Sequence, residues 1–257
     1  MKVRANRGWG GVMMAKQSGT DSNVSEASAP ELVSPSSRTI DEIEGHVARL
    51  MGAPAFVWHE MMSSVVHIDV HVILPSDENP YYTLFTTGMS DRAMEVPADV
   101  TEPAALQFAE LLMMLPPDWF DDPRSVEELG DERKYWPIRL LKSLARFPHE
   151  CHTWLGFGHS VPNGDPPSPF ADGTDLCCAL LVPPVRVPSE FYDLNLSDGR
   201  SINFYAVVPL YPEELQLKLT MGTNALLERF DVEGISELLD PKRVNTCSGW
   251  LDRLAVN

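Results

Sequence analysis

The pattern with the clearest chemical potential is HIDVH, which begins at His67. On a β-strand alternate residues share a face, so His67, Asp69 and His71 would line up roughly 6–7 Å apart. Zinc and iron accept two imidazoles and a carboxylate, and His59 or Glu60 could complete the set. The same pattern also fits the polar face of a half-buried strand with hydrogen-bonded histidines. Because the sequence identifies no ligand from a distant segment, we expect no metal and no cofactor.

The other motifs that could support catalysis are incomplete. Gly156 and Gly158 match the first two glycines of the dinucleotide-binding pattern G-x-G-x-x-G, but Val161 occupies the position of the third. A serine-hydrolase elbow needs a glycine where Pro162 stands, and the phosphate-binding P-loop pattern does not occur. We therefore predict a protein that is not an enzyme, with a metal-dependent enzyme built on the HIDVH face as the alternative.

A proline-rich loop is the candidate for partner binding. Prolines fix the backbone of residues 161–169, so ordering this loop on binding should cost little entropy. The loop follows an aromatic segment, and aromatic anchors rimmed by carboxylates suit the hot spot of a basic partner. In the other interpretation, Trp154 is a core residue and the proline-rich loop is only a rigid turn. The predicted partner-binding residues are Trp154, His159, Asn163 and Asp165, with His67, Asp69 and His71 nearby.

The charge of the chain is acidic and unevenly distributed. The formal net charge is −17, with +2 over residues 1–38 and −19 over the remainder. A protein with this acidic charge repels nucleic acid and anionic membranes and attracts cationic proteins. We expect a protein partner with a basic surface, and neither a nucleic acid nor a membrane. The alternative is that the acidity only keeps the protein soluble.

Cysteine usage and hydropathy indicate a cytoplasmic protein. None of the four cysteines forms a C-x-x-C pair, and Cys177 and Cys178 lie inside the apolar run LCCALLV, which is typical of core residues. No apolar run approaches the ~18–20 residues of a membrane span. Residues 1–17 carry positive charge without an apolar h-region, so we do not expect a secretory signal.

The first half of the chain predicts one helix and several strands. Thr39 begins a capping box, and apolar residues recur at helical spacing until Gly52. Strands are predicted over residues 55–59, 65–74, 81–87 and 109–115. The segment AALQFAELLMML could also be a helix, and we favour the strand because it runs directly into Pro116-Pro117.

A helix bracketed by Pro137 and Pro148 organises the second half. An aromatic strand over residues 154–159 and the proline-rich loop should follow it. The helix carries a basic stripe on one side. This stripe either pairs with the acidic segment 118–132, which we favour, or binds an acidic partner. The stripe consists of Arg139, Lys142 and Arg146.

The remaining elements complete the predicted architecture. Strands are expected over residues 176–182, 191–196 and 202–209, and helices over residues 212–221 and 224–230. The strands 109–115 and 176–182 both run into a Pro-Pro pair, which predicts that they stop at one rim of a sheet. Runs of strands flanked by helices, without strict β-α-β alternation, predict an α+β fold with a mixed β-sheet flanked by helices.

Composition divides the chain into three parts. Serine, proline and small polar residues near the N-terminus predict a disordered extension over residues 1–38. We expect one folded domain over residues 39–240. Residues 241–257 are weakly patterned and are predicted to form a C-terminal tail.

Long blocks of the chain resemble one family. WPIRLLKSLARFPHECHTWLGFGHSVPNGDPPSPF, followed by LCCALLVPP and INFYAVVPLYPEELQLKLTMGTNALLERF, resembles the Suppressor of fused (SUFU) domain family. HIDVHVILP, YYTLFTTGMSDRAM and AELLMMLPPDW resemble the first half of its bacterial members. The resemblance covers about residues 40–240.

The resemblance implies a single SUFU-like α+β domain without established catalysis. Eukaryotic members bind zinc-finger transcription factors of Hedgehog signalling and carry a second domain, for which this chain is too short. They also have an acidic residue before the histidine that matches His159, where this chain has Gly158. Several bacterial members act as immunity proteins against polymorphic toxins. The resemblance therefore implies an inhibitory protein-binding domain, with a cytosolic regulatory scaffold as the alternative.

Overall fold

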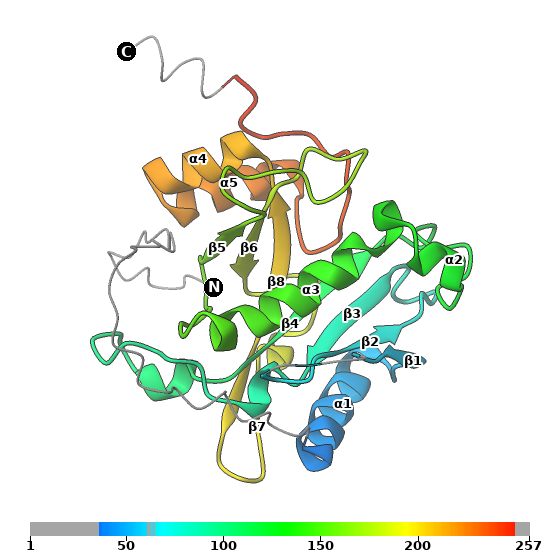
Figure 1. The fold of residues 1–257 in the computed structure, drawn as a ribbon, viewed down its shortest axis with the longest axis vertical. Helices are drawn as coiled ribbons and strands as arrows, with labels where there is room; N and C mark the ends of the chain where they lie inside the picture. The colour runs from blue at the N-terminus through cyan, green and yellow to red at the C-terminus, as the bar shows by residue number, and fades with distance from the viewer. Residues whose placement is uncertain (1–35, 61–62, 64, 250–257) are drawn as a thin grey trace, which may run out of the picture.

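A mixed β-sheet forms the centre of the computed structural model, which describes residues 36–60, 63 and 65–249 (Figure 1). The predicted α+β class is confirmed. The strands are β1 (Phe56–Trp58), β2 (Asp69–Ile73), β3 (Tyr82–Thr87), β4 (Ala109–Leu115), β5 (Ser160–Pro162), β6 (Cys178–Val182), β7 (Asp193–Asn195) and β8 (Ser201–Leu210). The helices are α1 (Ser37–Met51), α2 (Val126–Leu129), α3 (Glu132–Glu150), α4 (Pro212–Met221) and α5 (Thr223–Glu233). Short 3-10 turns are η1 (Met89–Asp91), η2 (Pro103–Leu106) and η3 (Ser189–Phe191).

The strand β8 joins the two halves of the sheet. The order is β1-β2-β3-β4-β8-β6-β5, and β7 also pairs with β8. The β4–β8 pair is parallel and every other pair is antiparallel. Because β4 and β6 run in opposite directions beside β8, their Pro-Pro ends do not share a rim, and that prediction is wrong. The proline pairs end each strand locally and carry no information on its direction.

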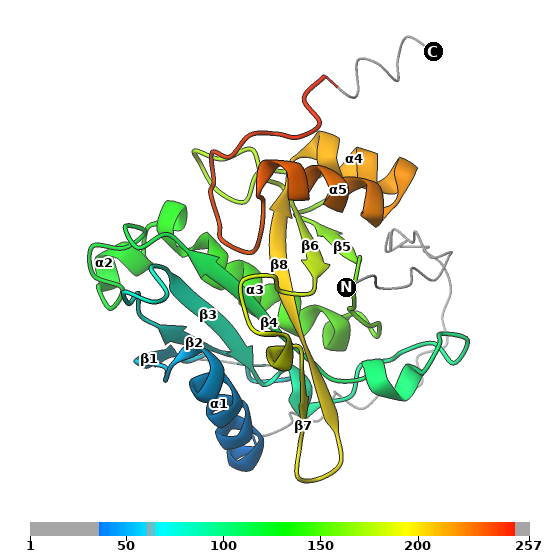
Figure 2. The same cartoon turned by 180° about the vertical axis from the view of Figure 1, so that it is seen from behind.

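Helices cover both faces of the sheet. Alternate residues of β2 and β4, such as Val70, Val72 and Leu111, face a core that also contains the apolar side of α3. Ile73 and Phe85 point to the opposite face, where they pack with α1, α4 and α5. Figure 1 shows α3 lying across the sheet, and Figure 2 shows α1 and α5 from the other side. Both faces are therefore buried.

The first helix begins earlier than the sequence predicted. The Ser36 side chain accepts a hydrogen bond from the Thr39 backbone N–H at 3.3 Å, so Ser36 is the N-cap and Thr39 lies inside α1. Gly52 ends the helix as predicted, with φ +103°. The predicted extension over residues 1–38 therefore ends by Ser36, and its residues 1–35 lie outside the described part of the chain.

The helix α3 is longer than its two prolines suggested. Asp131 caps it, accepting a hydrogen bond from the Arg133 backbone N–H at 3.0 Å, and both Pro137 and Pro148 lie within it. Trp136 is buried and stacks on Phe170 with ring centroids 5.2 Å apart. This packing and the cap favour a helical start ahead of Pro137, and they override the local cost of the proline.

Two other parts of the second half depart from the sequence prediction. Residues 154–159 form turns and not a strand, and the strand β5 begins only at Ser160. Residues 241–249, expected in a tail, pack against the domain, because Arg243 donates to the fully buried Glu214 at 2.7 Å and Cys247 is buried. Among the described residues, no helix has both the length and the apolarity to cross a bilayer.

Candidate functional site

The turn between α3 and β5 holds the two predicted aromatic residues. The Trp154 and His159 rings meet edge to face, with centroids 4.3 Å apart, and both residues are half-buried. A Cβ on Gly156 would lie 2.7 Å from the Trp154 ring, so the glycine lets this ring pack on the backbone. Alternating bulk in this segment therefore reflects a folded turn rather than the two faces of a strand.

Burial keeps this histidine neutral. Desolvation lowers the pKa of His159, a hydrogen bond to the Trp154 backbone opposes that shift, and the nearby Lys218 charge adds to it. Lys218 is itself buried and donates to Ser160 Oγ at 3.0 Å. Desolvation also lowers the pKa of Lys218. The imidazole thus presents a neutral ring at neutral pH.

Asn163 fixes the shape of the proline-rich loop. Its side-chain amide donates to the carbonyl oxygens of Ser168 and Pro169 at 2.9 and 3.0 Å. Ser168 in turn donates from its backbone N–H and its hydroxyl to the Asn163 carbonyl. The amide of Asn163 therefore braces the loop, while Asp165 at its tip is exposed to solvent.

Phe157 is a surface aromatic residue that the sequence prediction missed. Its side chain is 50% exposed, which is unusual for a large apolar residue. The GFG run was the available signal, because an aromatic residue between two glycines in a turn lacks neighbours that could cover it. We use the name loop surface for Trp154, Phe157, His159 and Asp165 together with β5.

The loop surface lies in an acidic part of the chain. No lysine or arginine occurs between Arg146 and Arg186. The acidic side chains of this segment are all exposed, and they are Glu150, Asp165, Asp172 and Asp175. The segment is acidic along the chain, while in space Lys218 of α4 contacts Ser160 of β5 at 3.0 Å and Asp172 lies near Arg133. A half-exposed aromatic ring on an acidic segment can contribute to binding of a cationic, partly apolar surface.

Asp69 is the centre of a second polar cluster. One carboxylate oxygen lies 2.9 Å from His59 Nδ1, and the other lies 3.1 Å from His67 Nε2. The Glu60 backbone N–H also donates to Asp69 at 3.0 Å. The segment after β1 is thereby folded back onto the start of β2.

The basic stripe of α3 is paired within the protein. Arg139 contacts Glu132 at 3.1 Å, so the predicted pairing with the acidic segment is confirmed for this residue and is wrong for Lys142 and Arg146. Arg146 forms an ion pair with Glu60, and Lys142 donates to the His59 carbonyl oxygen at 3.1 Å. These two cations therefore support the Asp69 cluster.

His71 does not join His67 and Asp69, so the predicted three-residue face is wrong. The strand β2 begins at Asp69, and His67 precedes the strand, so strand alternation does not place its side chain. His71 is buried, stacks on the Phe85 ring at 4.8 Å and lies 2.9 Å from Thr87 Oγ1. Burial lowers the pKa of His71 to about 4, with Asp69 opposing this shift, so the ring is neutral.

The strand order does not fix the distance between the two predicted groups of partner-binding residues. His67 precedes β2, and Trp154 and His159 precede β5, so none of the three lies on a strand. The expected proximity of the two groups and partner binding by either of them stay predictions.

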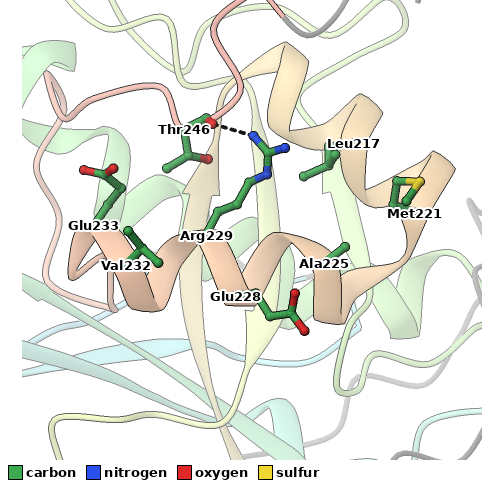
Figure 3. Close-up of a pocket in the computed structure, with 8 residues that line it drawn as sticks. All are labelled: Leu217, Met221, Ala225, Glu228, Arg229, Val232, Glu233 and Thr246. Carbon is green, nitrogen blue, oxygen red and sulfur yellow. Dashed lines mark hydrogen bonds between the residues drawn. The ribbon is translucent and has the colours of Figure 1, made fainter.

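A shallow pocket lies between α4 and α5 (Figure 3). Leu217, Met221 and Val232 contribute apolar walls, and Val232 is 82% exposed. Arg229, the base among the lining residues, donates to the Thr246 carbonyl oxygen at 2.8 Å. The arginine therefore holds the C-terminal segment and is not presented to a ligand.

Comparisons with known proteins agree on one family. The family model described as Suppressor of fused protein (SUFU) matches residues 64–244. A search of curated proteins found no match. A SUFU homolog from Neisseria gonorrhoeae FA 1090 has a TM-score of 0.53 at 16% identity, over 80% of this chain and 95% of that one.

Two further solved structures share the fold. A chain of the Sufu–Fu complex has a TM-score of 0.56 at 13% identity, over 86% of this chain and 96% of that one. Drosophila Suppressor of Fused has a TM-score of 0.53 at 13% identity, over 85% of this chain and 52% of that one. The present chain thus matches about half of the Drosophila protein.

Proposed function

Because the chain belongs to the Suppressor of fused family, we propose that it is a non-enzymatic protein-binding domain that inhibits a cationic protein. One structure with the same fold is described as the Sufu–Fu complex, which is a complex between proteins. That description supports binding of a protein partner as the activity of this chain as well.

The observation that carries the proposal is the loop surface. Phe157 is a half-exposed aromatic ring, and it lies in a 39-residue stretch of the sequence, between Arg146 and Arg186, that contains four carboxylates and no basic side chain other than histidine. Aromatic residues at the centre of an interface dominate binding energy, and acidic rims steer cationic partners. We place the partner's docking area at the loop surface for this reason.

The net charge supports a specific form of inhibition. A chain of net charge −17 attracts a basic protein over a long range and speeds its capture. Toxins that cleave nucleic acids tend to be basic, since basic side chains bind the polyanionic substrate. We therefore propose an immunity protein that neutralises a toxin of this kind, with a cytosolic scaffold as the alternative.

Capture and kinetics together test the proposal. The purified chain is used as bait with lysate of its source cells, and the captured protein is identified, purified and measured against variants of the chain. Phe157→Asp should weaken binding by roughly 30-fold or more, since hot-spot residues contribute about 2 kcal/mol or more. Val126→Asp is the matched control, because Val126 is 86% exposed on α2, outside the loop surface.

Three outcomes separate the alternatives. Equal affinities of wild type, Phe157→Asp and Val126→Asp would remove the loop surface as the docking area. Co-expression should protect cells from the captured protein if the chain is an immunity protein. A captured protein that is harmless when expressed alone would favour the scaffold.

A further inference from the structure

We propose that His59, His67 and Asp69 form a binding site for one zinc-type divalent cation. One donor atom from each residue can be chosen so that all three lie within 4.8 Å of one another. The two oxygens of Asp69 lie 2.9 Å from His59 Nδ1 and 3.1 Å from His67 Nε2, respectively. Ligands at about 2.0–2.1 Å from a tetrahedral zinc are about 3.3–3.4 Å apart, so donor atoms within 4.8 Å of one another must approach by up to roughly 1.4 Å. Rotation of the exposed His59 side chain can supply this movement.

Neighbouring groups hold two of these ligands in place. Ser63 Oγ lies 2.9 Å from His67 Nδ1, which leaves Nε2 as the ring nitrogen that faces the site. The Glu60 backbone N–H donates to Asp69 at 3.0 Å. Partners of this kind orient imidazole and carboxylate ligands in established metal sites, where their loss typically weakens metal binding 10- to 100-fold.

The cluster is open to solvent on one side. The His59 side chain is 71% exposed, whereas those of His67 and Asp69 are 26% and 11% exposed. A cation can therefore enter from water, and the fourth coordination position is left to a water molecule. Zinc and similar borderline cations fit this nitrogen-rich set better than Ca²⁺ or Mg²⁺, which prefer oxygen ligands.

The local charge sets an expectation for the affinity. The carboxylates near the site are Asp69, Glu60 and Asp91, which interacts with His67, and the cations are Lys142 and Arg146. Arg146 is occupied by its ion pair with Glu60. The two cations offset most of the carboxylate charge, so we expect binding in the micromolar range rather than the tighter binding of a fully anionic site.

The competing explanation is a hydrogen-bonded His–Asp–His cluster in which both imidazoles donate protons to Asp69. A metal would replace these two protons and bind the same nitrogens. The two explanations therefore differ in whether the purified chain takes up one cation.

Metal titration of the full chain tests the inference. Chelator-stripped protein is titrated with Zn²⁺ by calorimetry and with Co²⁺ by visible absorption, since Co²⁺ with four ligands absorbs intensely. We expect one cation per chain. His59→Ala should weaken binding about 10-fold or more, and this exposed residue can be replaced without loss of folding.

His152→Ala is the matched control. His152 is also exposed and lies 2.7 Å from a carboxylate, Glu95, so its replacement removes a similar pair elsewhere. Binding should be unchanged in this variant and about 10-fold weaker in Ser63→Ala. No stoichiometric uptake by the wild type, or equal uptake by His59→Ala, would overturn the metal site and leave only the hydrogen-bonded cluster. These results do not depend on any protein partner.

Discussion

Gly158 illustrates how one residue shapes the loop surface. Its φ is +77°, and a Cβ at this position would lie 2.9 Å from Thr223 Oγ1 at the start of α5. An acidic side chain at this position would require a left-handed backbone and would also collide with Thr223, so the local structure depends on glycine.

A pair of glycine variants separates the cost of a left-handed backbone from the cost of the contact with Thr223. Gly158→Asp should lower the free energy of unfolding by about 1–3 kcal/mol. Gly173→Asp is the control, because Gly173 has φ +90° and a Cβ added there would meet nothing within 4 Å. Urea unfolding should show a larger loss for Gly158→Asp than for Gly173→Asp. Equal losses would show that contact with Thr223 costs nothing.

Glu110 is a buried carboxyl group on β4. It accepts hydrogen bonds from Thr86 Oγ1 at 2.6 Å and from the Ser90 N–H and hydroxyl at 2.9 and 2.6 Å. Burial raises the pKa of Glu110 to about 7, although these hydrogen bonds oppose the shift. The folded protein therefore binds this proton more tightly than the unfolded chain does.

The consequence is a stability that falls with pH. The contribution of Glu110 is complete below the unfolded pKa of about 4.5 and is lost as the pH rises through about 7. Glu110→Gln removes this titration. The unfolding free energy of wild type minus that of the variant should therefore fall, by on the order of 3 kcal/mol, between pH 5 and pH 8.

Urea unfolding across that range measures the difference. Glu127→Gln, at an exposed glutamate of α2, serves as the control and should show no such slope. A constant difference between wild type and Glu110→Gln would contradict the assignment of a raised pKa to this carboxyl.

At the scale of elements, the start of α3 depends on one cap. The Asp131 side chain accepts from the Arg133 N–H and also pairs with the exposed Arg133 guanidinium. Asp131→Ala should lower the unfolding free energy by about 1 kcal/mol. Asp131→Asn keeps the cap and removes the ion pair, so it should cost much less, since exposed pairs contribute little. Equal costs in urea unfolding would assign the effect to the ion pair.

The elements that the sequence predicted well are those with a local signal. The strand over residues 109–115 and the helix over residues 212–221 have the predicted bounds, because apolar content, proline and glycine mark them directly. The predicted strand over residues 154–159 was wrong, because alternating aromatic bulk also fits a turn in which Trp154 packs on His159.

The candidate site was only partly predictable for a similar reason. Residue types pointed to His67 and Asp69, with His59 as a possible further ligand, but the departure of His71 depends on where β2 begins. The GFG run marks Phe157 as a candidate surface residue, but the fold of the turn, in which Gly158 packs on Thr223 of α5, depends on tertiary contacts. Tertiary contacts decided each of these cases.

At the scale of the whole molecule, net charge should govern the speed of association. If the loop surface captures a cationic protein, Asp165→Lys should lower the association rate and weaken its dependence on salt. Asp77→Lys gives the same change of net charge at an exposed position of the loop between β2 and β3. Stopped-flow or surface-binding measurements at two salt concentrations compare the two. Equal effects would mean that only net charge matters and that Asp165 is remote from the partner.

The parallel pairing of β4 with β8 has a consequence for the timing of synthesis. Residues 116–200 lie between these strands, and every residue of β4 is buried in the finished sheet. A ribosome that adds ~5–20 residues per second needs roughly 4–17 s to make that stretch. Until β8 emerges, one edge of β4 has no strand of its own chain to pair with, and unpaired edges invite association with other chains. The nascent protein therefore depends on protection during this interval, and the rate of translation, not only the amino-acid sequence, sets its exposure to misassembly.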